Sequence, residues 1–292
     1  MTVSEMSRSD FPRYPGGGGQ WLCALTTTGY DYLPEIRCRC DGGPHRSLGI
    51  AAQGYAAALS VEVRYGEVDI FADPGTYCYL GDAPWRSYFR SMAARDIPGS
   101  GNADRPIGGR ALRYRHTHAR KPAVVDHGDV ANWAAEHDGC FRLNSPVRHR
   151  RSVLLDRASR IVDIVDQIGG GGHDICSAFH FGPEIQVELG EFCAFLSWPG
   201  STTPGAARLE LPFGLSWSLR RAESNTVPRT LCRRVPAFTL LGSGRCVAGA
   251  PLTTRLEFND TENLSKDPLS QAVSFVSGSC RDKKHENQAG AI

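Results

Sequence analysis

The sequence has neither a long apolar run nor an export signal. No stretch of about 18 consecutive apolar residues occurs in the chain, so no membrane-spanning helix is expected. Residues 1–20 carry Asp and Glu early and have no apolar core, so we do not interpret them as a secretory signal peptide. The compartment in which the protein works is therefore left undetermined.

Net charge and common site motifs are also nearly absent. The chain has 33 Lys and Arg against 31 Asp and Glu, which leaves a formal charge of +2 and gives no reason to expect a nucleic-acid partner. The glycine run 169–172 lacks the Lys-Ser or Lys-Thr pair of a phosphate-binding loop, and we interpret it as a hairpin loop. No Gly-x-Ser-x-Gly nucleophile elbow is present.

Cysteine is plentiful, but its spacing indicates no metal motif. None of the 10 cysteines forms a Cys-x-x-Cys pair, so a zinc ribbon is not expected. Cys38 and Cys40 are the one close pair, and strand alternation would place both thiols on the same face. We expect free, mostly buried thiols and, without an export signal, a reducing compartment.

Alternation of apolar and polar residues is the dominant pattern. Leu59, Val61, Val63 and Tyr65 alternate with polar residues, a Gly-Glu turn follows, and residues 68–72 return as a second strand of a hairpin. Further strands are predicted at 152–155, 161–168, 175–181, 184–189, 192–198, 207–211, 216–220, 238–241 and 253–258. Helical periodicity is scarce, with 84–95 as the best short candidate. Short strands at regular spacing predict an all-β, antiparallel β-sandwich.

The composition divides the chain into three parts. Residues 1–20, which include four consecutive glycines, are expected to form a flexible leader. Residues 21–263 are expected to form the sandwich domain. Residues 264–292 turn polar and are expected to be a disordered tail.

Residues 53–63 and 69–77 resemble the signature of the heparinase II/III-like polysaccharide lyases. Further blocks resemble that family in the same order, at 39–45, 48–52, 84–91, 136–140, 147–151 and 180–183. The likeness extends over residues 21–258 and implies the C-terminal β-sandwich of that family. It also implies β-elimination on a uronic-acid-containing acidic polysaccharide, which needs a neutralised C5 carboxylate, a base and an acid.

In that family the sandwich follows an α/α-toroid, and the substrate cleft lies between the two. The toroid supplies most of the catalytic groups, including a proton-donating Tyr. Residues 1–20 leave no room for a toroid, so we expect it to be missing from this chain. A separately encoded toroid would then be the expected partner.

The family's reactive side chains are replaced here. Gln53 and Tyr55 stand where the family's His-Gly-His motif has its imidazoles, and Ala57 replaces an aspartate. Glutamine can form hydrogen bonds but cannot act as an acid or base near neutral pH. Residues 95–97 replace a His-Asn-Thr segment as well. We therefore expect this chain alone to be inactive or impaired.

By resemblance, two positions of this chain match the family's zinc site. Asp73 and His118 match two of the ligands, and the His116-x-His118 spacing places two imidazoles on one strand face. Structural zinc sites usually have four ligands, so this remnant would bind zinc only weakly. No cofactor is expected to be required.

Arginines form two local groups that could grip an acidic glycan. Arg110, Arg113, Arg115, Arg120 and Lys121 form the first group, and Arg148, Arg150 and Arg151 form the second. With Arg86, we consider Arg148 and Arg150 as candidate substrate-binding residues. The alternative is a solvated strand face, with His149 at the strand surface. Glu136, His137 and Asp138 are expected in a turn-rich, structural stretch.

Three hypotheses remain open at this point. The chain could be a lyase domain that regains activity with a toroid. It could be a non-catalytic module that binds acidic glycans, or a decayed lyase fragment that has no selected function.

Overall fold

The computed structural model describes much of the chain in short ranges. These are residues 22–27, 34–42, 59–73, 99–100, 122–140, 147–169, 174–200, 204–224, 235–245, 247 and 249–259. This part of the chain consists of strands joined by turns and contains no helix, so it also contains no helix that could cross a membrane. The expected leader, the expected tail and the helix candidate at 84–95 lie outside these ranges.

The described residues form 16 strands. They are β1 (Leu22–Thr26), β2 (Ile36–Asp41), β3 (Val61–Tyr65), β4 (Val68–Phe71), β5 (Gly99–Ser100), β6 (Ala123–His127), β7 (Val130–Cys140), β8 (Val147–Asp156), β9 (Ile161–Gly169), β10 (Asp174–His180), β11 (Gln186–Leu189), β12 (Cys193–Trp198), β13 (Gly205–Glu210), β14 (Leu215–Ser224), β15 (Val235–Arg245) and β16 (Pro251–Asn259).

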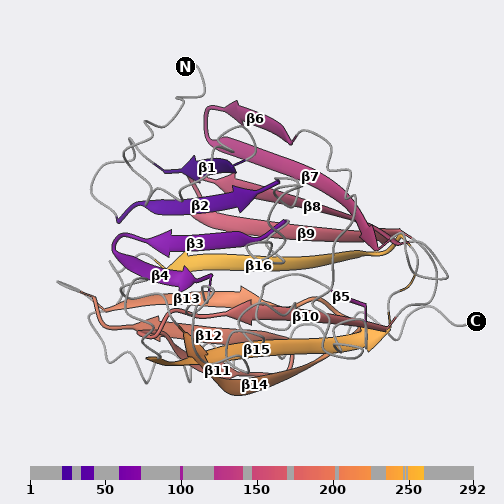
Figure 1. The fold of residues 1–292 in the computed structure, drawn as a ribbon. Coiled ribbons are helices and arrows are strands. Elements are labelled where there is room, and N and C mark those ends of the chain that lie inside the picture. The colour runs from indigo at the N-terminus through magenta and orange to yellow at the C-terminus, as the bar shows by residue number, and fades with distance from the viewer. Residues whose placement is uncertain are drawn as a thin grey trace, which may run out of the picture.

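All strand pairs are antiparallel and build two layers (Figure 1). One layer is an eight-stranded sheet in the order β11-β12-β13-β16-β9-β8-β7-β6. The other joins two four-stranded sheets, β1-β2-β3-β4 and β14-β15-β10-β5. A bridge between Phe71 and Phe181 connects them, and the Ala72 amide donates to the His180 carbonyl at 2.9 Å. The predicted antiparallel sandwich is therefore confirmed.

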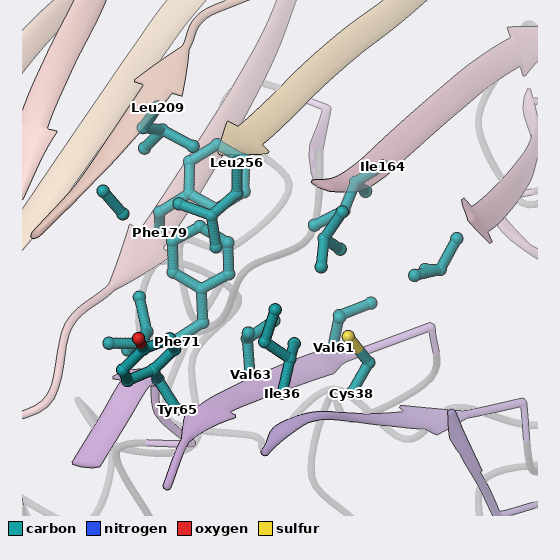
Figure 2. Close-up of a cluster of buried hydrophobic side chains, with 14 of the residues drawn as sticks. Ile36, Cys38, Val61, Val63, Tyr65, Phe71, Ile164, Phe179, Leu209 and Leu256 are labelled. Carbon is teal, nitrogen blue, oxygen red and sulfur yellow. The ribbon is translucent and has the colours of Figure 1, made fainter. Parts of the chain in front are cut away.

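The core lies between the layers because each strand turns every second side chain inward. Figure 2 shows Ile36 and Val63 from the sheet β1-β2-β3-β4 facing Ile164 and Leu256 of the eight-stranded sheet. Tyr65 stacks on Phe258 with ring centroids 5.1 Å apart. Burial of these alternating faces supplies the main driving force that holds the layers together.

Several sequence-based expectations are confirmed. The predicted hairpin is β3–β4, and its turn contains Gly66 in a left-handed conformation with φ of 56°. Nine further predicted strands correspond to β8 through β16, with shifted ends. Cys38 and Cys40 are both buried. They are thiols that form no disulfide, as are the partly buried Cys23, Cys176 and Cys193.

Other expectations are wrong. The stretch of Glu136, His137 and Asp138 lies within the long strand β7 and not in a turn-rich region. The glycine run cannot close a hairpin, because β9 and β10 belong to different layers and each pairs with other strands. No strand was predicted for β1, β2, β5, β6 or β7.

Gly182 belongs to the family-like block at 180–183 and is needed there for close packing of the backbone. Its amide donates to the Ile70 carbonyl at 3.3 Å, which brings the backbone after β10 against β4. A Cβ atom at position 182 would collide with the carbonyl oxygen of Asp69. The close approach that joins the two four-stranded sheets therefore requires glycine at this position.

We predict that Gly182→Ala destabilises the protein by about 1–3 kcal/mol through overpacking. This loss should lower Tm by roughly 2–4 °C per kcal/mol. Gly169→Ala is the matched control, because a Cβ there would lie 3.7 Å from its nearest neighbour. Thermal unfolding of the three proteins checks the prediction, and equal Tm values for the two variants would contradict it.

Candidate functional site

The described parts of both signature segments belong to the β3–β4 hairpin. Leu59 leads into β3, and Asp73 follows β4. The two strands are antiparallel with Val63 opposite Phe71, so the start of β3 and the end of β4 lie together. The predicted hairpin thus places the two segments side by side.

Leu59 is held in an unusual backbone conformation. Its φ is 62°, in the left-handed region that costs a non-glycine residue roughly 1–2 kcal/mol. Its amide donates to the Asp41 carbonyl at 2.7 Å. Its carbonyl accepts a hydrogen bond from Arg151 Nη1 at 2.8 Å. Contacts from both layers therefore fix this residue of the first signature segment.

Arg151 belongs to a buried cluster with Asp166 and His149. Arg151 Nε donates to Asp166 Oδ1 at 2.7 Å, and Nη2 donates to Oδ2 at 2.9 Å. His149 Nε2 lies 2.6 Å from Asp166 Oδ1. The carboxylate thus faces a two-pronged guanidinium and an imidazole at once, which is strong charge-assisted geometry.

Strand alternation and register assemble this cluster. His149 and Arg151 point inward from β8, on the same face as the buried Val153 and Leu155. Arg151 lies directly opposite Asp166 of β9. His149 lies diagonal to that carboxylate, which is within the reach of a long side chain across an antiparallel pair.

The cluster carries charge inside the sandwich. The Asp166 side chain is 4% exposed and the Arg151 side chain is fully buried. Burial alone would raise the pKa of Asp166, but Arg151 and His149 outweigh it and hold this pKa well below its usual range. Removing one partner of such a buried pair leaves an uncompensated charge, which costs about 3–5 kcal/mol.

Two sequence-based expectations fail at this cluster. His149 was expected at the strand surface, and Arg151 was grouped with Arg148 and Arg150 as a glycan-facing set. Both are buried, because alternation along β8 sends every second residue inward. Asp166 was not among the predicted site residues. The sequence does carry a signal for it, because Asp166 occupies an inward position in the alternating series of Val162, Ile164 and Ile168.

Arg148 and Arg150 face outward on the other side of β8. Arg150 is exposed, and the side chain of Arg148 is 54% exposed. Arg148 Nε lies 3.2 Å from Glu136 Oε1, so part of its charge is compensated. Arg86, the third candidate for substrate binding, lies outside the described residues.

Further charges on the outer face of the eight-stranded sheet are also paired. Arg255 donates to both oxygens of Asp163 at 2.8 and 2.9 Å. Arg208 lies 2.9 Å from Glu210 and 3.4 Å from Glu257. This region has the character of a solvated, charge-balanced strand face, where single pairs contribute little to stability.

The described residues leave the predicted zinc remnant and catalytic positions untested. Asp73 is partly exposed after β4, whereas His118, Gln53, Tyr55 and Ala57 lie outside the described ranges. No group of three or more metal-binding side chains gathers within those ranges. One carboxylate and one imidazole do not fit a structural zinc site, which usually has four ligands.

Comparison with known proteins gives a consistent family match. Residues 7–251 match the family described as heparinase II/III-like, C-terminal. No curated protein sequence matches the chain significantly.

Solved structures share the fold at low sequence identity. A heparinase III with methylated lysines is 14% identical with a TM-score of 0.62, covering 82% of this chain and 34% of that one. Heparan sulfate lyase HepC from Pedobacter heparinus is 11% identical with a TM-score of 0.64, covering 86% of this chain and 37% of that one. The chain thus spans about a third of the length of these structures.

We predict that Asp166→Asn lowers the free energy of unfolding by about 3–5 kcal/mol at pH 7. Because the folded pKa of Asp166 lies below its unfolded value of about 3.9, the carboxylate stabilises the fold above that pH. The contribution of this carboxylate to the free energy of unfolding declines as pH falls below about 4. The difference in unfolding free energy between the parent and Asp166→Asn should therefore become smaller there.

Denaturant unfolding from pH 7 to pH 3 measures this difference. Asp163→Asn on the same strand is the control, because its ion pair with the half-exposed Arg255 should cost less than about 1 kcal/mol. Equal losses of unfolding free energy for the two substitutions would show that the buried partners of Asp166 do not add to its stabilising effect.

Proposed function

Because the chain belongs to the heparinase II/III-like C-terminal family, we propose that it is the β-sandwich domain of a polysaccharide lyase. Its substrate would be an acidic polysaccharide that contains uronic acid. Catalysis would require an α/α-toroid domain that lies outside these 292 residues. The sandwich alone would be inactive or severely impaired.

One observation carries this proposal. Leu59 lies in the first signature segment and Asp73 in the second, both at the open end of the β3–β4 hairpin, and the Leu59 carbonyl accepts a hydrogen bond from the buried Arg151. This supports the proposal because the two segments that carry the family resemblance meet in one hairpin. The residues at positions 53 and 55 are Gln and Tyr, which supply neither the imidazole acid–base group nor the imidazole ligand of the family motif.

The chemistry of β-elimination explains why a second domain is needed. A base must remove the C5 proton and an acid must protonate the leaving oxygen. Gln53 can donate a hydrogen bond to a carboxylate but cannot accept that proton at neutral pH. His149 is buried and bonded to Asp166, so it cannot contact a polysaccharide chain. The toroid would therefore supply both proton-transfer groups.

No cofactor is part of this proposal. Weak zinc binding by Asp73 and His118 is compatible with it, but the replacement of an imidazole ligand by Tyr55 disfavours a structural site. No catalytic step passes through a metal.

We predict that the chain alone forms no unsaturated uronate product from heparan sulfate or other uronic-acid polysaccharides. Addition of a toroid domain taken from a heparinase III should produce measurable activity. Gln53→His combined with Tyr55→His should raise that activity further, because the variant restores titratable imidazoles. Product formation by the chain alone, unchanged by the toroid, would contradict the proposal.

A second candidate function is non-catalytic binding of an acidic glycan. The exposed Arg150 and the half-exposed Arg148 favour it, because both guanidinium groups lie on the outer face of β8. Arginine can bind carboxylate or sulfate groups through two parallel hydrogen bonds.

We predict that Arg148→Ala combined with Arg150→Ala weakens heparan sulfate binding at least about tenfold, corresponding to about 1.4 kcal/mol. Arg255→Ala is the matched control, since this arginine lies on the same sheet face but is paired with Asp163. Binding isotherms at fixed ionic strength measure the effect. Equal affinities for the parent and the double variant would rule out this binding surface.

A further inference from the structure

The first signature segment, residues 53–63, has Leu59 in the left-handed conformation just before β3 begins. Leu59 is only 1% exposed, so its carbonyl needs a hydrogen-bond donor from the protein. Arg151 of the opposite layer is that donor.

Asp166 determines where Arg151 points. A guanidinium is planar, and its donors have fixed relative directions. When Nε and Nη2 bind the two oxygens of Asp166, the remaining nitrogen Nη1 has a defined orientation, and here it lies 2.8 Å from the Leu59 carbonyl. His149 contacts the same carboxylate at 2.6 Å and helps to hold it in place.

We propose that Arg151 is a positioning residue, oriented by Asp166 and His149, that fixes the backbone of the first signature segment at Leu59, just before β3. It acts by stabilising the left-handed conformation of Leu59 from across the core. Its effect on glycan turnover rests on the proposed function, whereas its effect on the backbone at Leu59 does not.

Fold stability alone does not account for this cluster. Buried ion pairs can often be replaced by well-packed apolar residues with little loss of stability, or even with a gain. Val153 and Leu155, on the same face of β8, show that the surrounding core is apolar. An apolar residue at position 151 could fill the space, but it could not donate a hydrogen bond to Leu59.

Arg157, which directly follows β8, provides a matched comparison. It is also buried, and it donates to the carbonyls of Thr26 and Gly128 at 2.7 and 2.6 Å and to Asp126 Oδ2 at 2.9 Å. It therefore shares the chemistry of Arg151 but holds a different part of the backbone.

The experiment compares amide hydrogen exchange at single residues in the full chain by NMR. The informative amides are Leu59, which donates to Asp41, and Asp41, which donates to Ser60. The test variant combines His149→Phe, Arg151→Met and Asp166→Leu, so that no charge is left buried without a partner. Arg157→Met is the control, with the Thr27 amide as its local reporter.

In the triple variant we expect exchange at Leu59 and Asp41 to accelerate at least tenfold while cooperative unfolding persists. Arg157→Met should accelerate exchange at Thr27 and leave Leu59 unchanged. Unchanged exchange at Leu59 in the folded triple variant would overturn the proposal.

Arg151→Lys keeps the test decisive if the triple variant does not fold. Lysine retains the charge but cannot bind both oxygens of Asp166 and the Leu59 carbonyl in one fixed geometry. We expect accelerated exchange at Leu59 in this variant as well, and unchanged exchange would overturn the proposal.

A parallel lyase assay with an added toroid domain separates this inference from the proposed function. If the parent chain forms no product with the toroid, the lyase proposal fails while the exchange data still decide the role of Arg151. If the parent is active, Arg151→Lys should lower product formation, whereas Arg157→Met should leave it near the parent level.

Discussion

A buried guanidinium and carboxylate place the strongest constraint on this sandwich. Neither Arg151 nor Asp166 can be solvated between the two layers, so each requires the other in a fixed geometry. That geometry demands the register in which β8 and β9 place the two residues directly opposite each other. It also directs the remaining Arg151 donor at Leu59, and thereby connects the eight-stranded sheet to the start of β3. The apolar core allows the layers to pack, whereas this cluster specifies how β8, β9 and the residue before β3 are arranged.

The fold and the chemistry of the family place different demands on the residues of this chain. Two sheets with alternating apolar faces need only suitable side chains at inward positions, and those are present in most of the described strands. Gly182 preserves the close approach between β4 and the end of β10. A catalytic site needs particular side chains as well, and positions 53 and 55 carry Gln and Tyr and not His. The family match over residues 7–251 therefore establishes membership but does not by itself establish activity.

Sequence patterns predicted most strands with strong apolar alternation, although the regularly alternating β2 was missed. The β3–β4 hairpin and β9 have regular apolar alternation, and both were predicted. The edge strand β6 is largely exposed and thus has no apolar pattern to detect. In β7 the inward positions include Ala131 and Ala135, whose small side chains give a weak signal. The predicted hairpin at the glycine run failed because a turn motif does not reveal whether the next strand stays in the same sheet.

The sequence by itself determined the fold class, the family resemblance and the identity of the residues at the motif positions. These depend on local alternation and on residue type, which are both visible along the chain. Only the tertiary structure decided that Arg151 and His149 lie inside while Arg148 and Arg150 lie outside, and that Asp166 joins the first pair. A charged residue on a strand gives no local sign of burial, because its partner lies on another strand. The register between β8 and β9 and the closure of the second layer supply that partner.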